Sequence, residues 1–195
     1  MVSGMDELRN TATRVDPTKP VTEEEVLLVI RTHDTYLRGF TQRRVGLLSM
    51  AESIDDLIHS VSLRSTSATD NVRVQGGRSS YDTIYRIYET VEKQMKDQAD
   101  EVWKGLWLLD AEERKFTTIW GCFMSADPED VQLLTQLCYQ KKSVKEIRAE
   151  FRGGIMSEQG IYKRRRNAIR KIKDSSNMIY IPSPIAPHLG GDDNE

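Results

Sequence analysis

The chain has 195 residues, of which 38% are apolar and 30% are charged, and its formal net charge is -2. No stretch approaches the roughly 20 consecutive apolar residues that a membrane span needs, and the first 20 residues lack the apolar core of a secretory signal. We therefore expect a cytoplasmic protein without membrane contact, made of one sizeable domain or two small ones.

The beginning of the chain is polar. Residues 1–21 include Pro17 and Pro20 and are expected to form a flexible arm, because they offer little apolar surface to bury. Thr22 is followed by glutamates at positions 23–25, and the positive end of a helix dipole favours acidic residues in the first turn. A long helix is therefore predicted to begin at Thr22.

Spacings of three and four residues recur along this helix and along a second one, as in the seam of a coiled coil. The first seam comprises Val26, Ile30, His33, Leu37, Phe40, Arg44, Leu47, Ala51, Ile54, Ile58 and Val61. The second comprises Ile84, Tyr88, Val91, Met95, Gln98, Val102 and Leu109. Residues 65–80, rich in Ser, Thr and Gly, predict the turn between them.

The two seams predict a coiled-coil-like helical hairpin over residues 22–111. The same periodicity suits a seam buried within one chain and a seam shared by two copies, so the pattern leaves both open. We expect this region to form a homo-oligomer.

A further helix is predicted over residues 112–123, followed by one that begins with Asp127 as cap and Pro128 in its first turn. The aromatic residues before this point are expected to lie in the core: Trp103, Trp107, Phe116, Trp120 and Phe123. Cys122 and Cys138 lie in apolar helical surroundings, which favours free thiols in a reducing compartment.

The basic residues are concentrated in one block. Residues 141–173 contain twelve Lys or Arg and three Glu, a net charge of +9, whereas the whole chain is slightly acidic. Such a block is expected of a surface that binds phosphates, although a solvated basic helix would have the same composition.

Within this block the sequence predicts a helix-turn-helix. Ser143 and Glu146 form an S-x-x-E capping box that begins a short helix, the glycines at 153–154 allow a turn, and Ser157 caps a longer helix that reaches residue 173. At about 100° per residue, one face of that helix is apolar. That face carries Ile161, Ala168, Ile169 and Ile172.

The other face of the predicted second helix is polar, as a helix that enters the major groove of DNA requires. We expect the residues that read base edges to be Ser157, Gln159, Lys163, Arg166, Asn167 and Arg170. Four basic residues near the ends of the preceding helix are expected to hold phosphates: Lys141, Lys142, Lys145 and Arg152.

The pattern of Ser143, Glu146-Ile147, Phe151, Ser157, Ile161, Ala168-Ile169 and Lys171-Ile172 resembles region 4 of sigma-70-type factors. Upstream, DNVRVQGGRSSYDTIYRIYETVEKQM is similar to phage and mobile-element transcription regulators of the RinA and ArpU type. The resemblance implies a helix-turn-helix that binds promoter DNA, with RNA polymerase as a partner. The chain departs from the pattern in a longer turn after Phe151 and in Arg164, where an apolar residue is usual.

No set of residues suggests catalysis. His33, His59 and His188 lack the spacing of metal ligands, and no acidic pair lies near a nucleophile or base in the sequence. We expect no cofactor, no metal and no enzymatic activity.

The sequence thus predicts an all-α chain: a flexible arm (1–21), a helical hairpin (22–111), a helix-turn-helix domain (112–174) and a disordered tail (175–195). We expect a sequence-specific double-stranded DNA-binding transcriptional regulator. Two alternatives remain, a phage small terminase subunit and a coiled-coil protein-interaction module that does not bind DNA.

Overall fold

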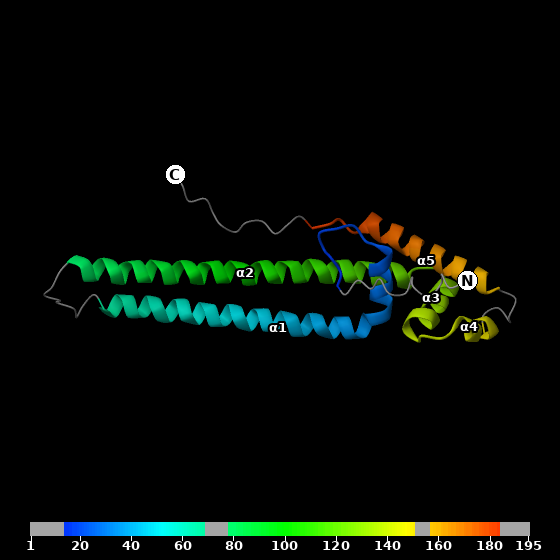
Figure 1. The fold of residues 1–195 in the computed structure, drawn as a ribbon, viewed down its shortest axis with the longest axis horizontal. Helices are drawn as coiled ribbons and strands as arrows, with labels where there is room; N and C mark the ends of the chain where they lie inside the picture. The colour runs from blue at the N-terminus through cyan, green and yellow to red at the C-terminus, as the bar shows by residue number, and fades with distance from the viewer. Residues whose placement is uncertain (1–13, 69–77, 151–156, 184–195) are drawn as a thin grey trace, which may run out of the picture. The chain divides into compact units, whose positions relative to one another are not determined.

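The computed structural model describes residues 14–68, 78–150 and 157–183. These residues form the helices α1 (Glu23–Ala68), α2 (Arg78–Met124), α3 (Pro128–Leu134), α4 (Val144–Glu150) and α5 (Glu158–Ile179), with a π-helical turn η2 (Thr135–Tyr139) after α3 (Figure 1). The predicted all-α class and the two long N-terminal helices are confirmed.

The helix α2 is longer than expected. It continues without a break from Arg78 to Met124, although the sequence suggested separate helices on either side of residue 111. Residues 109–112 are Leu, Asp, Ala and Glu, and this stretch contains neither the glycine nor the proline that would end a helix.

The chain divides into two compact units. Among the described residues, unit 1 combines 14–40 with 110–150 and 157–183, and unit 2 comprises 41–68 and 78–109. The predicted hairpin, residues 22–111, includes the first turns of α1, which belong to unit 1.

In unit 1 the beginning of α1 packs against the last turns of α2. The rings of Tyr36 and Phe116 are stacked with centroids 4.9 Å apart, and Phe40 meets Phe116 edge-on at 5.7 Å. Phe40, Phe116 and Phe123 are buried, and Trp120 stacks on His33 at 3.6 Å. The aromatic residues of this unit therefore supply core packing, as expected.

Residues 14–21 of unit 1 precede α1 and include a turn at residues 17–18. Val15 and Val21 are buried, and the Pro17 carbonyl accepts hydrogen bonds from the Tyr180 hydroxyl and the Ser183 amide. These residues are therefore fixed, in contrast to the flexible arm that the sequence suggested. The arm's first thirteen residues lie outside the described range.

The end of α5 is also more ordered than predicted. The helix continues to Ile179, and Ser176 and Tyr180 are buried. Asn177 exchanges two hydrogen bonds with the backbone of Val21. The disordered tail expected from residue 175 is therefore wrong for residues 175–183, and the remainder lies outside the described residues.

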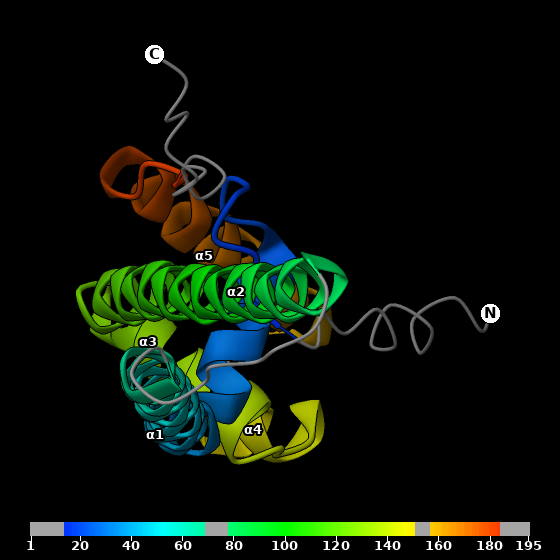
Figure 2. The same ribbon diagram turned by 90° about the vertical axis from the view of Figure 1, so that its left-hand side faces the viewer.

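Unit 2 contains the second part of α1 and the first part of α2, which lie side by side (Figures 1 and 2). The helices approach closely at Gly105, where a β-carbon would lie 3.2 Å from Leu47 Cδ2. Among the side chains described in this unit, only Val102 and Leu109 are buried. Trp103 is 54% exposed, so the expectation that it lies in the core is wrong.

Candidate nucleic-acid interface

A small apolar core holds α3, α4 and α5 of unit 1 together. Leu133, Ile147 and Ile161, one from each helix, are completely buried, and Leu137 and Val144 pack against them. The helices α4 and α5 therefore share a core with α3, as a helix-turn-helix supported by a preceding helix requires. Residues 151–156 of the predicted turn lie outside the described range.

The first helix of this motif begins as the sequence predicts. The Glu146 carboxylate accepts from the backbone amide of Ser143 at 2.7 Å, and the Ser143 hydroxyl accepts from the Glu146 amide at 3.3 Å. The bond from the Ser143 amide holds the pKa of Glu146 below its usual range. This reciprocal capping box satisfies amides that the first turn of α4 would leave without partners.

The connection from α3 to α4 was not foreseen in detail. Asp127 caps α3 as predicted, but the chain then widens into the π-helical turn η2. Lys141 follows with a φ of 55°, a left-handed conformation that glycine or asparagine adopts more easily. The predicted phosphate ligand Lys141 therefore also closes the helix, and its side chain remains exposed.

The helix α5 has the two faces that the sequence predicts. The Ser157 hydroxyl accepts from the Gly160 amide at 3.1 Å, which begins the helix. Its apolar face is buried at Ile161, Ala168, Ile169 and Ile172. The residues proposed to read bases are all exposed: Ser157, Gln159, Lys163, Arg166, Asn167 and Arg170.

The four proposed phosphate ligands are in different situations. Lys141 and Lys145 are exposed, whereas Lys142 is partly covered and its Nζ pairs with Glu150 at 2.8 Å. This ion pair makes Lys142 less available than we expected. Arg152 lies outside the described residues. Arg148 of α4 is exposed and basic, although it was not among the predicted phosphate ligands.

Arg164 has a structural role. Its guanidinium bonds to Asp130 at 2.5 Å and Glu129 at 2.7 Å, and it lies 3.5 Å from Asp127. Burial acts against the charged form, but the bond to Asp130 and the neighbouring carboxylates raise the pKa of Arg164. Arg164 departs from the expected apolar pattern because it forms an ionic clamp between α3 and α5. The clamp also neutralises acidic charge beside the exposed face of α5.

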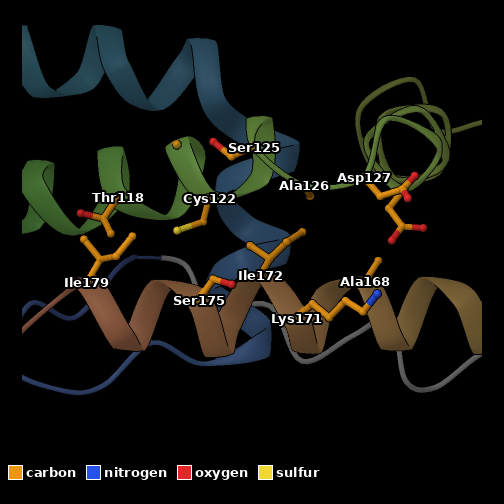
Figure 3. A pocket seen from close by; sticks show the side chains of 12 residues that line it. Thr118, Cys122, Ser125, Ala126, Asp127, Ala168, Lys171, Ile172, Ser175 and Ile179 are labelled. Atoms are coloured by element: carbon orange, nitrogen blue, oxygen red, sulfur yellow. The ribbon is translucent and has the colours of Figure 1, made fainter.

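Two shallow hollows border α5. One, of about 510 Å³, is lined by polar residues that include Lys163, Asn167 and Arg170 of the predicted DNA-binding face. The other, of about 470 Å³, lies between the end of α2 and α5, where Thr118 and Cys122 face Ile172 and Ser175 (Figure 3). The first hollow is a depression in the exposed polar face of α5, beside the clamp at Arg164.

Neither a metal centre nor a membrane span is found in the described part of the chain. No group of three or more His, Cys, Asp or Glu there is placed to hold a metal ion. No helix formed by these residues is long and apolar enough to cross a membrane. Cys122 and Cys138 are free thiols, and burial raises the pKa of Cys138.

Comparison with known proteins found no protein-family model, no curated protein and no solved structure that matches the chain. The geometry of α3, α4 and α5 is therefore the basis for inferring a function.

Proposed function

We propose that the protein binds double-stranded DNA through the exposed face of α5 and regulates transcription in a sequence-specific manner. The observation that carries the proposal is the division of α5 into two faces. The buried face holds the helix on α3 and α4, and the opposite face presents Lys163, Arg166 and Arg170 together with the amides of Gln159 and Asn167. A helix of this kind fits a major groove about 12 Å wide.

The side chains on this face suit the chemistry of DNA. Arginine can donate two hydrogen bonds to guanine, and asparagine or glutamine can pair with adenine in the same groove. Among the described residues, Lys163, Arg166 and Arg170 form no ion pair with a carboxylate, so their charges are available to a ligand. Base recognition and phosphate attraction are thus combined on one helix.

The exposed basic residues of α4 extend this surface. Lys145 and Arg148 supply positive charge one helix away from α5, and Lys141 adds more just before α4. Contacts of this type fix a protein on the phosphate backbone without reading sequence. The resemblance to sigma region 4 and to RinA- and ArpU-type regulators supports promoter DNA as the target, phage or mobile-element origin and RNA polymerase as a partner.

The proposal is tested by binding with purified full-length protein. Selection from a random duplex library identifies the preferred site, and fluorescence anisotropy then gives the affinity of the wild type and of the Lys163→Ala/Arg166→Ala/Arg170→Ala variant. We expect a loss of affinity of at least about 100-fold at moderate salt, because three cationic contacts are removed.

The matched control removes the same charge elsewhere. Arg86, Lys93 and Lys96 are exposed residues of unit 2, so the Arg86→Ala/Lys93→Ala/Lys96→Ala variant has the same net charge as the α5 variant. Its affinity should change less than about threefold if the contacts are local. Equal losses in both variants, or no enrichment of any sequence, would contradict sequence-specific binding by α5. If the protein instead occupied DNA-packaging loci and not promoters, it would be a terminase subunit.

A further inference from the structure

The two hollows beside α5 adjoin each other at Lys171, which lines both of them. The hollow of about 470 Å³ lies between α2 and α5, with Ile179 at one end and Lys171 at the other (Figure 3). We call it the α2–α5 hollow. The hollow of about 510 Å³, which we call the basic hollow, continues from Lys171 to Lys163. Together they lead along α5 from its last turn to the proposed DNA-binding face.

The two hollows differ in chemistry. Most of the surface in the α2–α5 hollow is apolar and includes Cys122, Ile172 and Ile179. The basic hollow is lined by four cationic and two acidic side chains, namely Lys163, Arg164, Arg170, Lys171, Asp127 and Asp130. A ligand that follows both hollows would therefore be apolar beside α2 and acidic beyond Lys171.

The acidic side chains of the basic hollow are already compensated. The Arg164 guanidinium bonds to Asp130 at 2.5 Å and lies 3.5 Å from Asp127. Among the described residues, the remaining cations Lys163, Arg170 and Lys171 form no ion pair. Their charge is therefore available to an acidic ligand.

The chain itself contains a segment with this composition in this order. The sequence PIAPHLGGDDNE follows Ser183 and contains neither Lys nor Arg. Its apolar residues come first and end with Leu189, and after two glycines come the three acidic residues Asp192, Asp193 and Glu195. A segment that returns along α5 from the end of the helix meets the α2–α5 hollow first and the basic hollow second.

The segment is also long enough. Ser183 is four residues after Ile179, which separates them by at most about 14 Å, and Lys171 lies about 12 Å from Ile179 along the helix. Asp192 is nine residues after Ser183 and can extend about 30 Å, more than the sum of about 26 Å. Leu189, six residues after Ser183, can extend about 20 Å and so reaches the α2–α5 hollow.

We propose that residues 189–195 of the same chain bind along these hollows. Leu189 occupies the α2–α5 hollow, and the carboxylates of Asp192 and Asp193 meet Arg170 and Lys171. The bound segment covers part of the face of α5 that is proposed to meet DNA. Residues 189–195 and DNA therefore compete for α5, and this competition, unlike the binding of the segment itself, rests on the proposed function.

Binding of the segment is tested in the full chain without DNA. A carbodiimide couples a carboxylate to an amine where the two groups are in contact, and peptide mass spectrometry of the monomer then identifies the joined residues. We expect Asp192 or Asp193 to be joined to Lys171, with a yield that does not change on dilution. The absence of this link, or its presence in covalent dimers alone, would overturn the proposal, and the latter result would indicate the segment of a second copy.

Filling the α2–α5 hollow should displace the segment. A β-carbon at Gly121 meets no atom within 4 Å, so Gly121→Leu occupies the hollow without a clash. It should lower the cross-linking yield at least about tenfold, the factor expected when one leucine is no longer buried. Gly46→Leu is the matched control, because Gly46 of unit 2 has the same open space, and its yield should equal that of the wild type.

Leu189→Ser gives a second measurement that leaves the residues lining the hollow unchanged, and it should lower the yield by a similar factor. Circular dichroism checks the helical content of every variant. An unchanged yield in Leu189→Ser, or in a folded Gly121→Leu variant, would overturn the proposal.

The competition is tested by fluorescence anisotropy on a selected DNA site. Asp192→Asn/Asp193→Asn/Glu195→Gln should raise DNA affinity at least about threefold, because the competing carboxylates are removed. The control Glu89→Gln/Asp97→Asn/Glu101→Gln removes the same charge from exposed residues of unit 2 and should change affinity less than about twofold. Equal gains in both variants would overturn the competition.

The two readouts separate this proposal from the proposed function. Cross-links in a chain that binds no DNA would contradict DNA binding and support the docked segment. DNA binding without the cross-links would overturn the docked segment alone.

Discussion

The Lys115 side chain of α2 meets the Glu25 carboxylate of α1 at 2.8 Å, and both groups are almost completely excluded from solvent. The same ammonium donates to the carbonyls of Asp16, Lys19 and Pro20 at 2.7, 3.0 and 3.3 Å. Glu25 in turn accepts from the amides of Asp16 and Thr22. One ion pair therefore fastens residues 14–21 to both long helices. Pro17 and Val21 of that segment also form hydrogen bonds with the end of α5 and the residues after it.

Replacing Lys115 by methionine tests this arrangement. The substitution keeps an unbranched side chain but leaves the Glu25 carboxylate buried without its cation, which costs far more than the loss of a surface pair. We expect the free energy of unfolding to fall by about 3 kcal/mol. Urea denaturation followed by circular dichroism measures the change.

Lys19→Ala provides the comparison. Lys19 pairs with Asp16 at 2.9 Å, but its side chain is 73% exposed, so solvent screens the interaction and a much smaller loss of stability than for Lys115→Met is expected. If Lys115→Met and Lys19→Ala shifted the unfolding midpoint by similar amounts, the buried pair would not be the fastening contact that its geometry indicates.

Neighbouring residues of α5 should separate stability from DNA binding. Arg164→Ala leaves the buried carboxylate of Asp130 without its closest cation and should lower the free energy of unfolding by about 2 kcal/mol. Lys163→Ala should leave the unfolding midpoint unchanged and weaken DNA binding, because Lys163 is exposed. Thermal unfolding and anisotropy on both variants give the comparison, and an unchanged melting temperature in Arg164→Ala would argue against the clamp.

The segment of residues 14–21 contains a carboxyl group with a strongly lowered pKa. Lys19 and the hydroxyl and amide of Thr18 stabilise the Asp16 carboxylate and lower its pKa to about 2. An aspartate in an unfolded chain has a pKa of about 3.9. The stabilisation is therefore fully present above about pH 4 and is lost as the pH falls towards 2.

Carboxyl chemical shifts in a pH titration by NMR measure this effect directly. Asp16 should titrate with a midpoint near 2, and Lys19→Met should move the midpoint towards the ordinary value of about 3.9. Thr18→Val, which removes the hydroxyl donor but keeps the amide, should move it by a smaller amount. A wild-type midpoint at the ordinary value would show that residues 16–19 do not hold this turn in solution.

The local features of the fold were predictable from sequence because they depend on neighbouring residues. Ser143 with Glu146, Asp127 before Pro128, and the apolar face from Ile161 to Ile172 all act within one or two helical turns, and the structure agrees with them. The equivalent capping pair of Thr22 and Glu25 was present in the sequence but went unnoticed. A hydroxyl residue followed three positions later by glutamate was the available signal.

The features that were missed depend on residues far apart in the chain. Arg164 looked misplaced because its carboxylates belong to α3, more than thirty positions earlier, and the Asp34 carboxylate accepts from the Tyr139 hydroxyl across 105 positions. The first seam passes from unit 1 to unit 2 at residue 40 without a change of periodicity. Periodicity shows which face of α1 is covered and leaves open which part of the chain covers it.

The proposed DNA contacts should fall into two energetic classes. Lys145 and Arg148 of α4 are assigned to phosphates, so Lys145→Ala/Arg148→Ala should weaken binding to all duplexes alike and reduce the slope of log affinity against log salt by about 1.8, about 0.9 for each lost contact. Gln159 and Asn167 carry no charge, so Gln159→Ala/Asn167→Ala should leave that slope unchanged. The latter variant should instead lose about 1–3 kcal/mol of discrimination at the base pairs that it no longer reads.

Salt titrations on the selected site and on single-base variants of it distinguish these outcomes. A reduced salt slope in the amide variant, or a changed sequence preference in the α4 variant, would show that the two helices have exchanged the roles assigned to them.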